Sequence, residues 1–332
     1  MSTRQLKAVR VAGTGSYLPE RVVTNEDFRK AGLETDDEWV RTRTGIRERR
    51  FARPDQATSD LALEACKRAL EAAETTPNDL DVIICASMTS DYVIPSTAAL
   101  LQRSLGAEKA GGFDLSAACS GFVLSMQTGA QFIQTGAAKK VLVVGAEKMS
   151  YIVDQTKRDT AVLFGDGAGA AVLDVDPTGA SDLLAHRSGL RGDHESLVVP
   201  SSGSRNPVTH ETIENRTNLV HMKGRETFKF AVSTFVDLIE KTCADAGVKP
   251  EQISIVVPHQ VNMRILEAAS ERCGVPLSKM HLNIETVGNT SAASVGIALD
   301  EAVRAGKIRR GDLVLMVAFG AGLSWGSALL RW

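Results

Sequence analysis

The 332-residue sequence predicts an α/β protein built from two similar halves. Residues 77–86 resemble residues 250–259, which lie 173 positions later, and each segment follows a stretch with helical spacing of its apolar residues. A second pair of similar segments surrounds Gly136 and Gly306, which lie 170 positions apart. We expect one half in residues 1–175 and the other in residues 176–332. The duplicated pattern predicts a five-layered α-β-α-β-α sandwich.

Both halves alternate strand and helix patterns, which the spacing of the apolar residues predicts. The predicted elements of the first half are, in order, a strand at 8–12, a helix at 59–73, strands within 77–86 and at 110–115, a helix at 121–135 and a strand at 170–173. Those of the second half are a helix at 231–246, a strand at 255–257 and a helix at 292–305. The helices at 121–135 and 292–305 are rich in glycine, alanine and serine, so we expect these two to be buried between the sheets.

Two polar stretches interrupt this pattern. Residues 188–218 lack clear periodicity and predict a solvated loop; the histidines around it, whose spacing fits no usual metal site, are His186, His194, His210 and His221. Residues 41–53 carry six arginines and one acid. Such a charged segment predicts a solvated face. The alternative is an edge that binds phosphate, because the planar guanidinium of arginine matches the geometry of phosphate oxygens.

Cys119 lies between a predicted strand and the first turn of the helix at 121–135. The unpaired N–H groups and the positive end of a helix dipole favour a thiolate over a thiol there. We therefore expect a reactive sulfur. The alternative is a cysteine that acts only as a small buried apolar residue.

His259 and Asn289 are predicted to lie near Cys119. Asn289 follows Cys119 by the 170-residue repeat distance and lies in a similar small-residue turn before a helix. His259 follows Pro258, which cannot donate a ladder hydrogen bond and so ends the strand at 255–257. Ligands of α/β sheets gather at the carboxyl ends of strands. The alternative for His259 is a structural histidine with satisfied hydrogen bonds.

Several segments together carry a resemblance to a known family. The sequence resembles the thiolase-fold condensing enzymes, and most closely the β-ketoacyl-acyl carrier protein synthase III family, from one end of the chain to the other. The matching segments are 13–19, 43–49, 117–122, 164–170, 257–264, 288–294 and 318–328. The resemblance implies the thiolase-like form of the five-layered sandwich.

The resemblance also implies a reaction that initiates fatty acid synthesis. In a decarboxylating Claisen condensation, an acyl-CoA starter first acylates Cys119, and the acyl-cysteine then combines with malonyl-acyl carrier protein. His259 and Asn289 are expected to donate hydrogen bonds to the enolate oxygen that forms on decarboxylation. The backbone N–H groups of Cys119 and Ala321 are expected to form the oxyanion hole. Coenzyme A enters as part of a substrate, and the resemblance implies neither a cofactor nor a metal.

Further positions of the sequence match binding residues of the family. Trp39 and Arg158 resemble a pair that holds the adenine of coenzyme A between them, and Arg43 resembles a phosphate contact. The alternative for Trp39 is a core-packing residue of an amphipathic helix. Lys229 and Arg264 resemble basic residues that meet the acidic carrier protein.

The predicted acyl pocket contains Ile94 and Phe319. Some family members carry a bulky aromatic residue at the position of Ile94, so we expect this chain to admit a longer or branched acyl group. The family also implies a homodimer in which a residue near Ile94 comes from the partner.

Composition excludes other classes of function. A formal charge of −2 gives no electrostatic case for binding nucleic acid or a membrane surface. The five cysteines are widely spaced and predict neither a zinc site nor disulfides, and we expect Cys66, Cys85 and Cys243 in the core. The first residues contain no apolar signal region, and no run of roughly 18 apolar residues follows. We therefore expect a soluble cytoplasmic protein.

Other functions remain as alternatives. A relative could use the same acyl-cysteine with a different acceptor, as an acyltransferase or a quinolone- or polyketide-type synthase does. A scaffold or chain-length subunit would have lost its nucleophile, whereas Cys119 is present. A cysteine hydrolase would need His259 as a base and a path for water. Thiolases and hydroxymethylglutaryl-CoA synthases are disfavoured, because they need a second cysteine or a glutamate base where this chain has Asn289.

Overall fold

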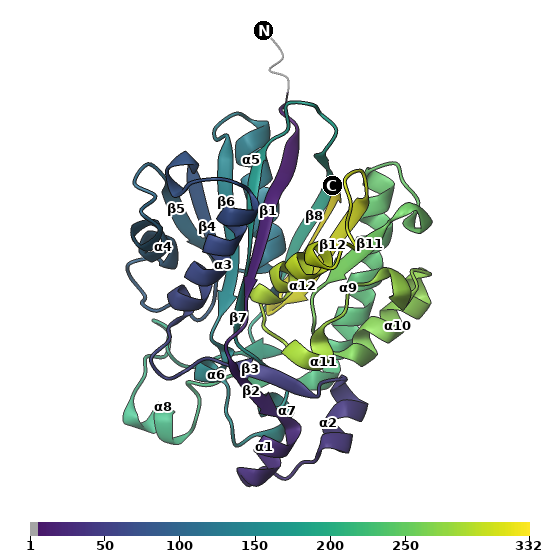
Figure 1. The fold of residues 1–332 in the computed structure, drawn as a ribbon. Coiled ribbons are helices and arrows are strands. Elements are labelled where there is room, and N and C mark those ends of the chain that lie inside the picture. The colour runs from purple at the N-terminus through teal and green to yellow at the C-terminus, as the bar shows by residue number, and fades with distance from the viewer. Residues whose placement is uncertain (1–5) are drawn as a thin grey trace.

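Two mixed β-sheets form the framework of the protein (Figure 1), whose computed structural model describes residues 6–332. The first sheet has the order β1-β7-β6-β4-β5 and contains β1 (Val9–Tyr17), β4 (Val82–Ala86), β5 (Gly111–Leu115), β6 (Lys140–Glu147) and β7 (Gly167–Val175). The second has the order β11-β12-β13-β8 and contains β8 (Asp182–Asp193), β11 (Ile255–Pro258), β12 (Leu313–Gly320) and β13 (Gly322–Arg331).

The two sheets share one internal order. In the first, β4 is parallel to β6, β6 is antiparallel to β7, and β7 is antiparallel to β1. In the second, β11, β12, β13 and β8 repeat these three relationships in the same sequence. Met280 forms an isolated parallel bridge with Val256 beyond β11, at the place that β5 takes beyond β4. This correspondence supports the repeat detected in the sequence, and the boundary between residues 175 and 176 stays a proposal.

Helices α5 (Gly121–Gln134) and α12 (Ala293–Arg304) lie between the sheets, as predicted. Their apolar side chains share one core cluster with strands of both sheets. Small residues permit the close approach. A Cβ atom on Gly169 of β7 would lie 2.3 Å from the backbone of Gly296 in α12, so any larger residue would separate the helix from the strand.

The outer faces of the sheets are covered by two further helical layers. Helices α3 (Thr58–Ala72) and α4 (Thr97–Leu105) pack on the first sheet, and α9 (Gly224–Asp245) and α10 (Met263–Cys273) pack on the second. The order of layers is therefore α-β-α-β-α, which confirms the predicted thiolase-like sandwich. Cys66, Cys85 and Cys243 are buried, as predicted.

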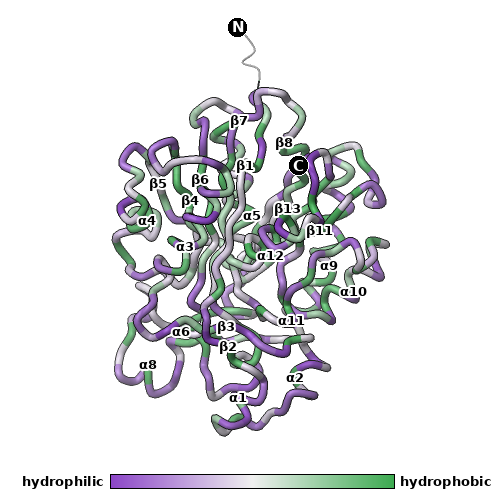
Figure 2. The backbone as a smooth tube through the Cα atoms, in the orientation of Figure 1, coloured by the Kyte–Doolittle hydropathy of each residue, from purple (hydrophilic) through white to green (hydrophobic). Residues whose placement is uncertain are grey.

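Short elements gather at one end of the sandwich (Figure 1). Hydrophilic residues are frequent in the segment around α1 and α2 (Figure 2). The short strands are β2 (Arg21–Thr24), β3 (Glu48–Phe51), β9 (Leu197–Val198) and β10 (His221–Met222). The short helices are α1 (Asn25–Lys30), α2 (Asp37–Thr44), α6 (Met149–Ile152), α7 (Arg158–Ala161), α8 (His210–Glu214) and α11 (Ile284–Val287).

The prediction of a solvated loop at 188–218 was wrong for residues 188–193. Strand β8 continues to Asp193 and pairs with β13. It is the edge strand of its sheet and most of its later side chains are exposed, so backbone hydrogen bonds hold it without an alternating apolar pattern. Beyond it, β9 and α8 add further regular structure, with His210 as the first residue of α8.

The interpretation of residues 41–53 as a solvated face or phosphate edge was wrong for Arg49. This side chain is fully buried, and its guanidinium donates hydrogen bonds to the carbonyl oxygens of Val23 and Val162. Burial lowers the pKa of Arg49 to about 10. Arg49 therefore joins β3 to neighbouring segments and is not available to a ligand.

Within residues 6–332, no helix combines the length and apolar character needed to cross a membrane. Residues 1–5, where the sequence predicts no apolar signal region, lie outside the described part of the chain.

Candidate active site

Cys119 lies in a 3-10 turn, Ala118–Ser120, between β5 and α5. Its side chain is buried, and Ala118 before it has a left-handed backbone with φ of 48°. The backbone of Gly320, the last residue of β12, packs closely against this turn. A Cβ atom at position 320 would lie 2.7 Å from the Cys119 nitrogen, so only glycine allows β12 to approach the cysteine this closely.

The expectation that the helix end makes Cys119 a thiolate was wrong. Burial raises the pKa of Cys119 to about 11; a hydrogen bond with Ser291 opposes the rise, and the nearby Glu147 carboxylate adds to it. Helix α5 begins at Gly121, two residues after the cysteine. The cost of desolvating a thiolate therefore exceeds the stabilisation from the helix end.

His259 follows β11, as predicted, and its backbone N–H donates to the Val317 carbonyl at 2.8 Å. The imidazole is buried, with Nδ1 2.6 Å from the Ser294 hydroxyl. Its ring meets the Phe319 ring edge-on, with centroids 5.8 Å apart. Burial lowers the pKa of His259 to about 3, so the ring is neutral at physiological pH.

Asn289 lies in the turn before α12 and is held by its own backbone. Its N–H donates to the Leu163 carbonyl at 2.9 Å, and its carbonyl accepts from Gly165 N–H at 3.0 Å. The side-chain oxygen Oδ1 accepts from the Ser291 N–H at 2.9 Å. Because the oxygen is occupied in this way, the Nδ2 amide group is the part of the side chain left to donate.

The segment from Asn289 to Ser294 connects the three predicted residues. The Ser291 hydroxyl lies 3.5 Å from the Cys119 sulfur, and the Ser291 carbonyl accepts from Ser294 N–H at 3.2 Å. Ser294 in turn contacts His259. The cysteine, histidine and asparagine therefore belong to one hydrogen-bonded set of residues, assembled from both halves of the chain.

Ala321 lies in the tight turn between β12 and β13, and its carbonyl accepts from Ser324 N–H at 3.2 Å. The residue of this turn that lies against the Cys119 backbone is Gly320, which precedes Ala321. The turn is fixed to the cysteine segment, because the Ser324 hydroxyl donates to the Ala117 carbonyl at 2.9 Å. The role of the Ala321 N–H in an oxyanion hole stays a prediction.

Glu147, the last residue of β6, was missed at the level of sequence. It is fully buried, and its carboxylate accepts a hydrogen bond from the Ser291 hydroxyl at 3.2 Å. Burial raises the pKa of Glu147 to about 7, opposed by hydrogen bonds from Thr89, Met88, Ser291 and Ser87. The only signal in the sequence is an acid that directly follows a run of apolar and small residues at 141–146.

The residues expected to bind coenzyme A lie together. The Arg158 guanidinium lies 4.2 Å from the centre of the Trp39 ring, and that of Arg43 lies 4.9 Å from it. Arg158 also donates to the Glu34 carbonyl at 2.9 Å and lines a cavity of about 900 Å³. Arg158 stacks directly on Trp39, so a base enters between them only if the arginine moves.

The residues expected at the carrier protein and the acyl chain are more dispersed. Lys229 on α9 and Arg264 on α10 are both exposed. Phe319 is buried beside His259. Ile94 is 84% exposed on its own chain, and its place in an acyl pocket stays a prediction.

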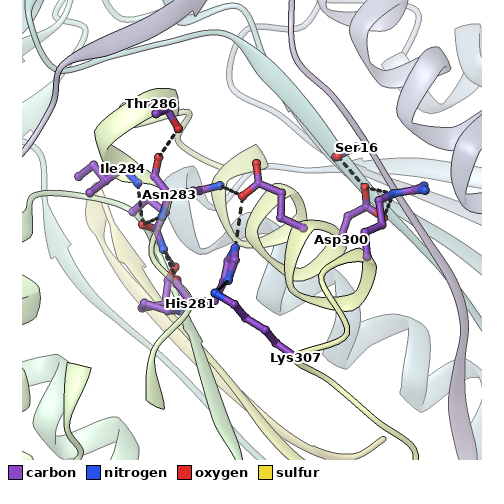
Figure 3. Close-up of polar contacts among 11 residues, drawn as sticks. Ser16, His281, Asn283, Ile284, Thr286, Asp300 and Lys307 are labelled. Carbon is purple, nitrogen blue, oxygen red and sulfur yellow. Dashed lines mark hydrogen bonds and ion pairs between the residues drawn. The ribbon is translucent and has the colours of Figure 1, made fainter. Parts of the chain in front are cut away.

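Gln260 anchors the segment that carries His259. Its amide nitrogen donates to the carbonyls of Pro258 and His281 at 2.9 and 3.0 Å, and its oxygen accepts from Asn283 N–H at 3.1 Å. The side chains of His281 and Asn283 both reach the Glu301 carboxylate, and Lys307 contacts His281 (Figure 3). Among the described residues, no group of three or more His, Cys, Asp or Glu side chains is arranged to hold a metal ion.

Comparisons with known proteins agree on one family. A family model described as 3-oxoacyl-[acyl-carrier-protein (ACP)] synthase III matches residues 113–192, and the model of its C-terminal part matches residues 243–332. A β-ketoacyl-[acyl-carrier-protein] synthase III of Caldanaerobacter subterraneus subsp. tengcongensis is 49% identical over 325 residues, which are 98% of each chain.

Solved structures give the same result. The crystal structure of 3-oxoacyl-[acyl-carrier-protein] synthase III from Aquifex aeolicus VF5 matches with a TM-score of 0.90 and 45% identity, over 98% of this chain and 100% of that one. The priming β-ketosynthase of the R1128 polyketide biosynthetic pathway matches with a TM-score of 0.90 and 36% identity, over 99% of this chain and 98% of that one.

Proposed function

The chain belongs to the β-ketoacyl-[acyl-carrier-protein] synthase III family, and from that premise we propose how its own residues carry the reaction. It is a condensing acyltransferase that joins an acyl-CoA starter to malonyl-acyl carrier protein and so initiates fatty acid synthesis. The observation that carries the proposal is the hydrogen-bonded segment Asn289 to Ser294, which contacts both Cys119 and His259.

In the first half-reaction, Cys119 attacks the thioester carbonyl of acyl-CoA. A new carbon–sulfur bond forms to the cysteine, the bond to coenzyme A breaks, and free coenzyme A leaves as a thiol. The negative charge on the carbonyl oxygen of the intermediate is stabilised by backbone N–H groups of Cys119 and Ala321. Sulfur suits this step because a thiolate is both a strong nucleophile and a good leaving group.

In the second half-reaction, the malonyl group loses carbon dioxide, and negative charge develops on its thioester oxygen. The resulting enolate carbon attacks the acyl-cysteine, which yields β-ketoacyl-carrier protein and frees Cys119. His259 and Asn289 donate hydrogen bonds to the thioester oxygen. A neutral imidazole suits this task, and the low pKa of His259, about 3, keeps the ring in that state.

Trp39, Arg158 and Arg43 bind the coenzyme A part of the first substrate. Their aromatic and guanidinium groups already contact one another, and a purine base would replace the Arg158 contact on the Trp39 ring. Lys229 and Arg264 attract the acidic carrier protein, because both are exposed cations. Phe319 borders the acyl chain beside His259. The protein acts in the cytoplasm.

A second copy of the chain completes the acyl pocket. Gly111, Gly112 and Phe113 of β5 are exposed, and β5 forms the open edge of its sheet. Edge strands of this kind are usually paired or covered. The apolar side chains of Tyr92, Val93 and Ile94 are also largely exposed. We propose a homodimer in which the edge strands face each other and Ile94 enters the partner's site, where its size admits a longer or branched acyl chain.

A condensation assay tests the proposed function. The purified protein is supplied with acetyl-CoA or branched acyl-CoAs and with malonyl-carrier protein, and the β-ketoacyl product and carbon dioxide are measured. The proposal predicts equal amounts of both products, and none above background with Cys119→Ala. Full turnover by the Cys119→Ala variant, or free acid as the only product, would reject it.

The similarity to a priming β-ketosynthase of a polyketide pathway favours one second candidate. Here the same acyl-cysteine would react with a carrier protein of polyketide synthesis. The two candidates differ only in the acceptor. Condensation with malonyl groups on a fatty-acid carrier protein, compared with a polyketide carrier protein, separates them.

A further inference from the structure

Glu147 is a buried acid that the proposed reaction does not use. Its carboxylate accepts from the hydroxyl groups of Thr89 and Ser291 at 2.6 and 3.2 Å, from that of Ser87 at 3.3 Å, and from the backbone N–H of Met88 at 3.1 Å. None of the ion pairs formed by the described side chains includes Glu147. All four of these partners donate to the carboxylate, so the oxygens of Glu147 act as acceptors of hydrogen bonds.

Ser291 connects this acid to the nucleophile. Its hydroxyl lies 3.5 Å from the Cys119 sulfur and 3.2 Å from Glu147 Oε1. The directions are consistent, because the thiol donates to the serine oxygen while the serine hydroxyl donates to the carboxylate. Ser291 has a left-handed backbone with φ of 51°, an unfavourable conformation for serine, and its side chain is fully buried. The turn therefore holds the hydroxyl between the two groups.

We propose that Ser291 and Glu147 form a proton relay for Cys119, in which the Ser291 hydroxyl touches the reacting sulfur and Glu147 acts through it as a positioning residue. This inference rests on the proposed acylation of Cys119. It adds to that reaction the route by which the thiol loses its proton in a buried site.

The proton balance of loading is as follows. As the Cys119 sulfur attacks the acyl-CoA carbonyl, the thiol proton passes to the Ser291 oxygen, and the Ser291 proton passes to the Glu147 carboxylate. The carbon–sulfur bond to coenzyme A then breaks, and the coenzyme A thiolate takes a proton from water. The products are the acyl-cysteine, free coenzyme A and a neutral Glu147 carboxylic acid.

Condensation reverses the relay. The enolate carbon attacks the acyl-cysteine, and the Cys119 sulfur leaves as a thiolate. The proton stored on Glu147 returns through Ser291 to that sulfur, which restores the thiol and the carboxylate. One solvent proton is consumed in each cycle, as the loss of carbon dioxide from a malonate carboxylate requires.

The charges around the relay suit this exchange. Burial raises the pKa of the Cys119 thiol to about 11, so the side chain is almost entirely protonated at neutral pH. The pKa of Glu147, about 7, lets the carboxyl group hold or release a proton in that range. The buried thiol of Cys85 on β4 is a further titratable group near Glu147. The Lys148 ammonium faces away and donates to the carbonyls of Arg53 and Gln56.

A competing role for Glu147 makes the opposite prediction. If its negative charge only opposed thiolate formation, Glu147→Gln would lower the pKa of Cys119 and acylation would become faster. A purely structural role in holding Thr89 and Met88 would change stability but not the shape of the pH profile. The relay predicts slower acylation and a changed profile.

The experiment measures the rate of Cys119 acylation by acetyl-CoA with intact-protein mass spectrometry. The pH runs from roughly 5.5 to 9, a range that spans the titration of Glu147 and stays below that of the Cys119 thiol. In the wild type, the rate should rise to a plateau near pH 7 to 8, as Glu147 ionises. In Glu147→Gln and in Ser291→Ala it should be about 10²-fold lower at neutral pH and rise roughly tenfold per pH unit. The double variant should be no slower than either single variant.

Two further variants test the relay in case the Glu147→Gln or Ser291→Ala protein does not fold. Thr89→Ala removes a donor to the Glu147 carboxylate, so the plateau should begin at higher pH. Glu147→Asp keeps a carboxylate and should recover part of the plateau. Thermal unfolding of each variant identifies those that fold.

The outcomes separate this inference from the proposed function. If wild-type protein acquires no acyl group on Cys119, the proposed function fails. If the wild type is acylated and folded Glu147→Gln or Ser291→Ala protein is acylated as fast or faster, the relay alone is overturned. An unchanged pH profile in Thr89→Ala likewise overturns it.

Discussion

The Ser294 hydroxyl lies 2.6 Å from Nδ1 of His259, and the same oxygen accepts the Gln260 backbone N–H at 3.4 Å. A hydroxyl oxygen can accept two hydrogen bonds, so the Gln260 contact alone does not direct its proton; we assign that proton to Nδ1 because the described residues offer the Ser294 hydroxyl no other acceptor. This assigns the imidazole proton to Nε2, the nitrogen on the other side of the ring. Ser294 therefore prepares His259 to donate a hydrogen bond to a substrate oxygen.

Ser294→Ala should reduce condensation more than acylation. The variant removes the group that selects the Nε2–H tautomer, and the loss of one such hydrogen bond corresponds to about tenfold in rate. The two half-reactions are measured separately, acylation by mass spectrometry and condensation from preformed acyl-enzyme. Equal losses in both would contradict the assigned role.

His259→Ala and Asn289→Ala should each lower condensation by about 10²- to 10³-fold, because each removes a donor to the enolate oxygen. Acylation of Cys119 should survive in both. In the wild type, condensation from the acyl-enzyme should show no change from ionisation of His259 above pH 5, because the pKa of His259 is about 3. A histidine-dependent fall in rate between pH 6 and 7 would disagree with a neutral imidazole.

Arg158→Ala and Trp39→Ala should raise the KM for acyl-CoA while the rate at saturation changes little. The proposal gives the stacked pair a role in binding coenzyme A and none in bond making, so its loss should weaken binding without slowing the chemical step. Arg41→Ala is the matched control, since Arg41 lies on the same helix but pairs with Asp37. A comparable rise in KM for Arg41→Ala would mean that net charge, and not stacking, is responsible.

Gly320→Ala should impair both folding and acylation, because the added Cβ would lie 2.7 Å from the Cys119 nitrogen. Either β12 or the cysteine turn must move. Gly203→Ala is the control, since a Cβ there meets no atom within 4 Å. Thermal unfolding and the acylation rate are compared in both variants, and a Gly320→Ala protein with normal stability and normal acylation would argue against the close contact.

Burial of Glu147 makes stability depend on pH. Its pKa is about 7 in the folded protein and 4.5 in its ordinary state, so the folded state binds the proton more tightly between these values. The free energy of unfolding should therefore be highest below pH 4.5 and fall as pH rises through 7, by on the order of 3 kcal/mol relative to Glu147→Gln. Denaturant unfolding of both proteins from pH 4 to 8 measures the difference. A wild-type free energy of unfolding that rises with pH relative to that of Glu147→Gln would have the wrong sign.

The sequence predicted the features that repeat or follow a regular period. Cys119 and Asn289 could be located because the same strand, turn and helix occur twice, and His259 because Pro258 marks the end of a strand. Glu147 could not, since one acid after an apolar run resembles any strand end. Its importance depends on Ser87, Thr89 and Ser291, which come from distant segments.

Burial explains the remaining errors. An arginine in a charged segment looks exposed, yet Arg49 finds two backbone carbonyls in the interior. The thiol of Cys119 looks activated by a helix, yet its desolvation prevails. Each of these outcomes depends on which distant residues surround the side chain, and local patterns do not contain that information.

The most direct test of the account is to identify the acylated residue. Wild-type protein is incubated with acyl-CoA, digested and analysed by mass spectrometry, and a second sample is then treated with malonyl-carrier protein. We expect an acyl group on Cys119 alone, which disappears from wild-type protein on addition of the malonyl substrate and persists in Asn289→Ala. An acyl group on another residue, or product formation without an acyl-Cys119 intermediate, would contradict the account.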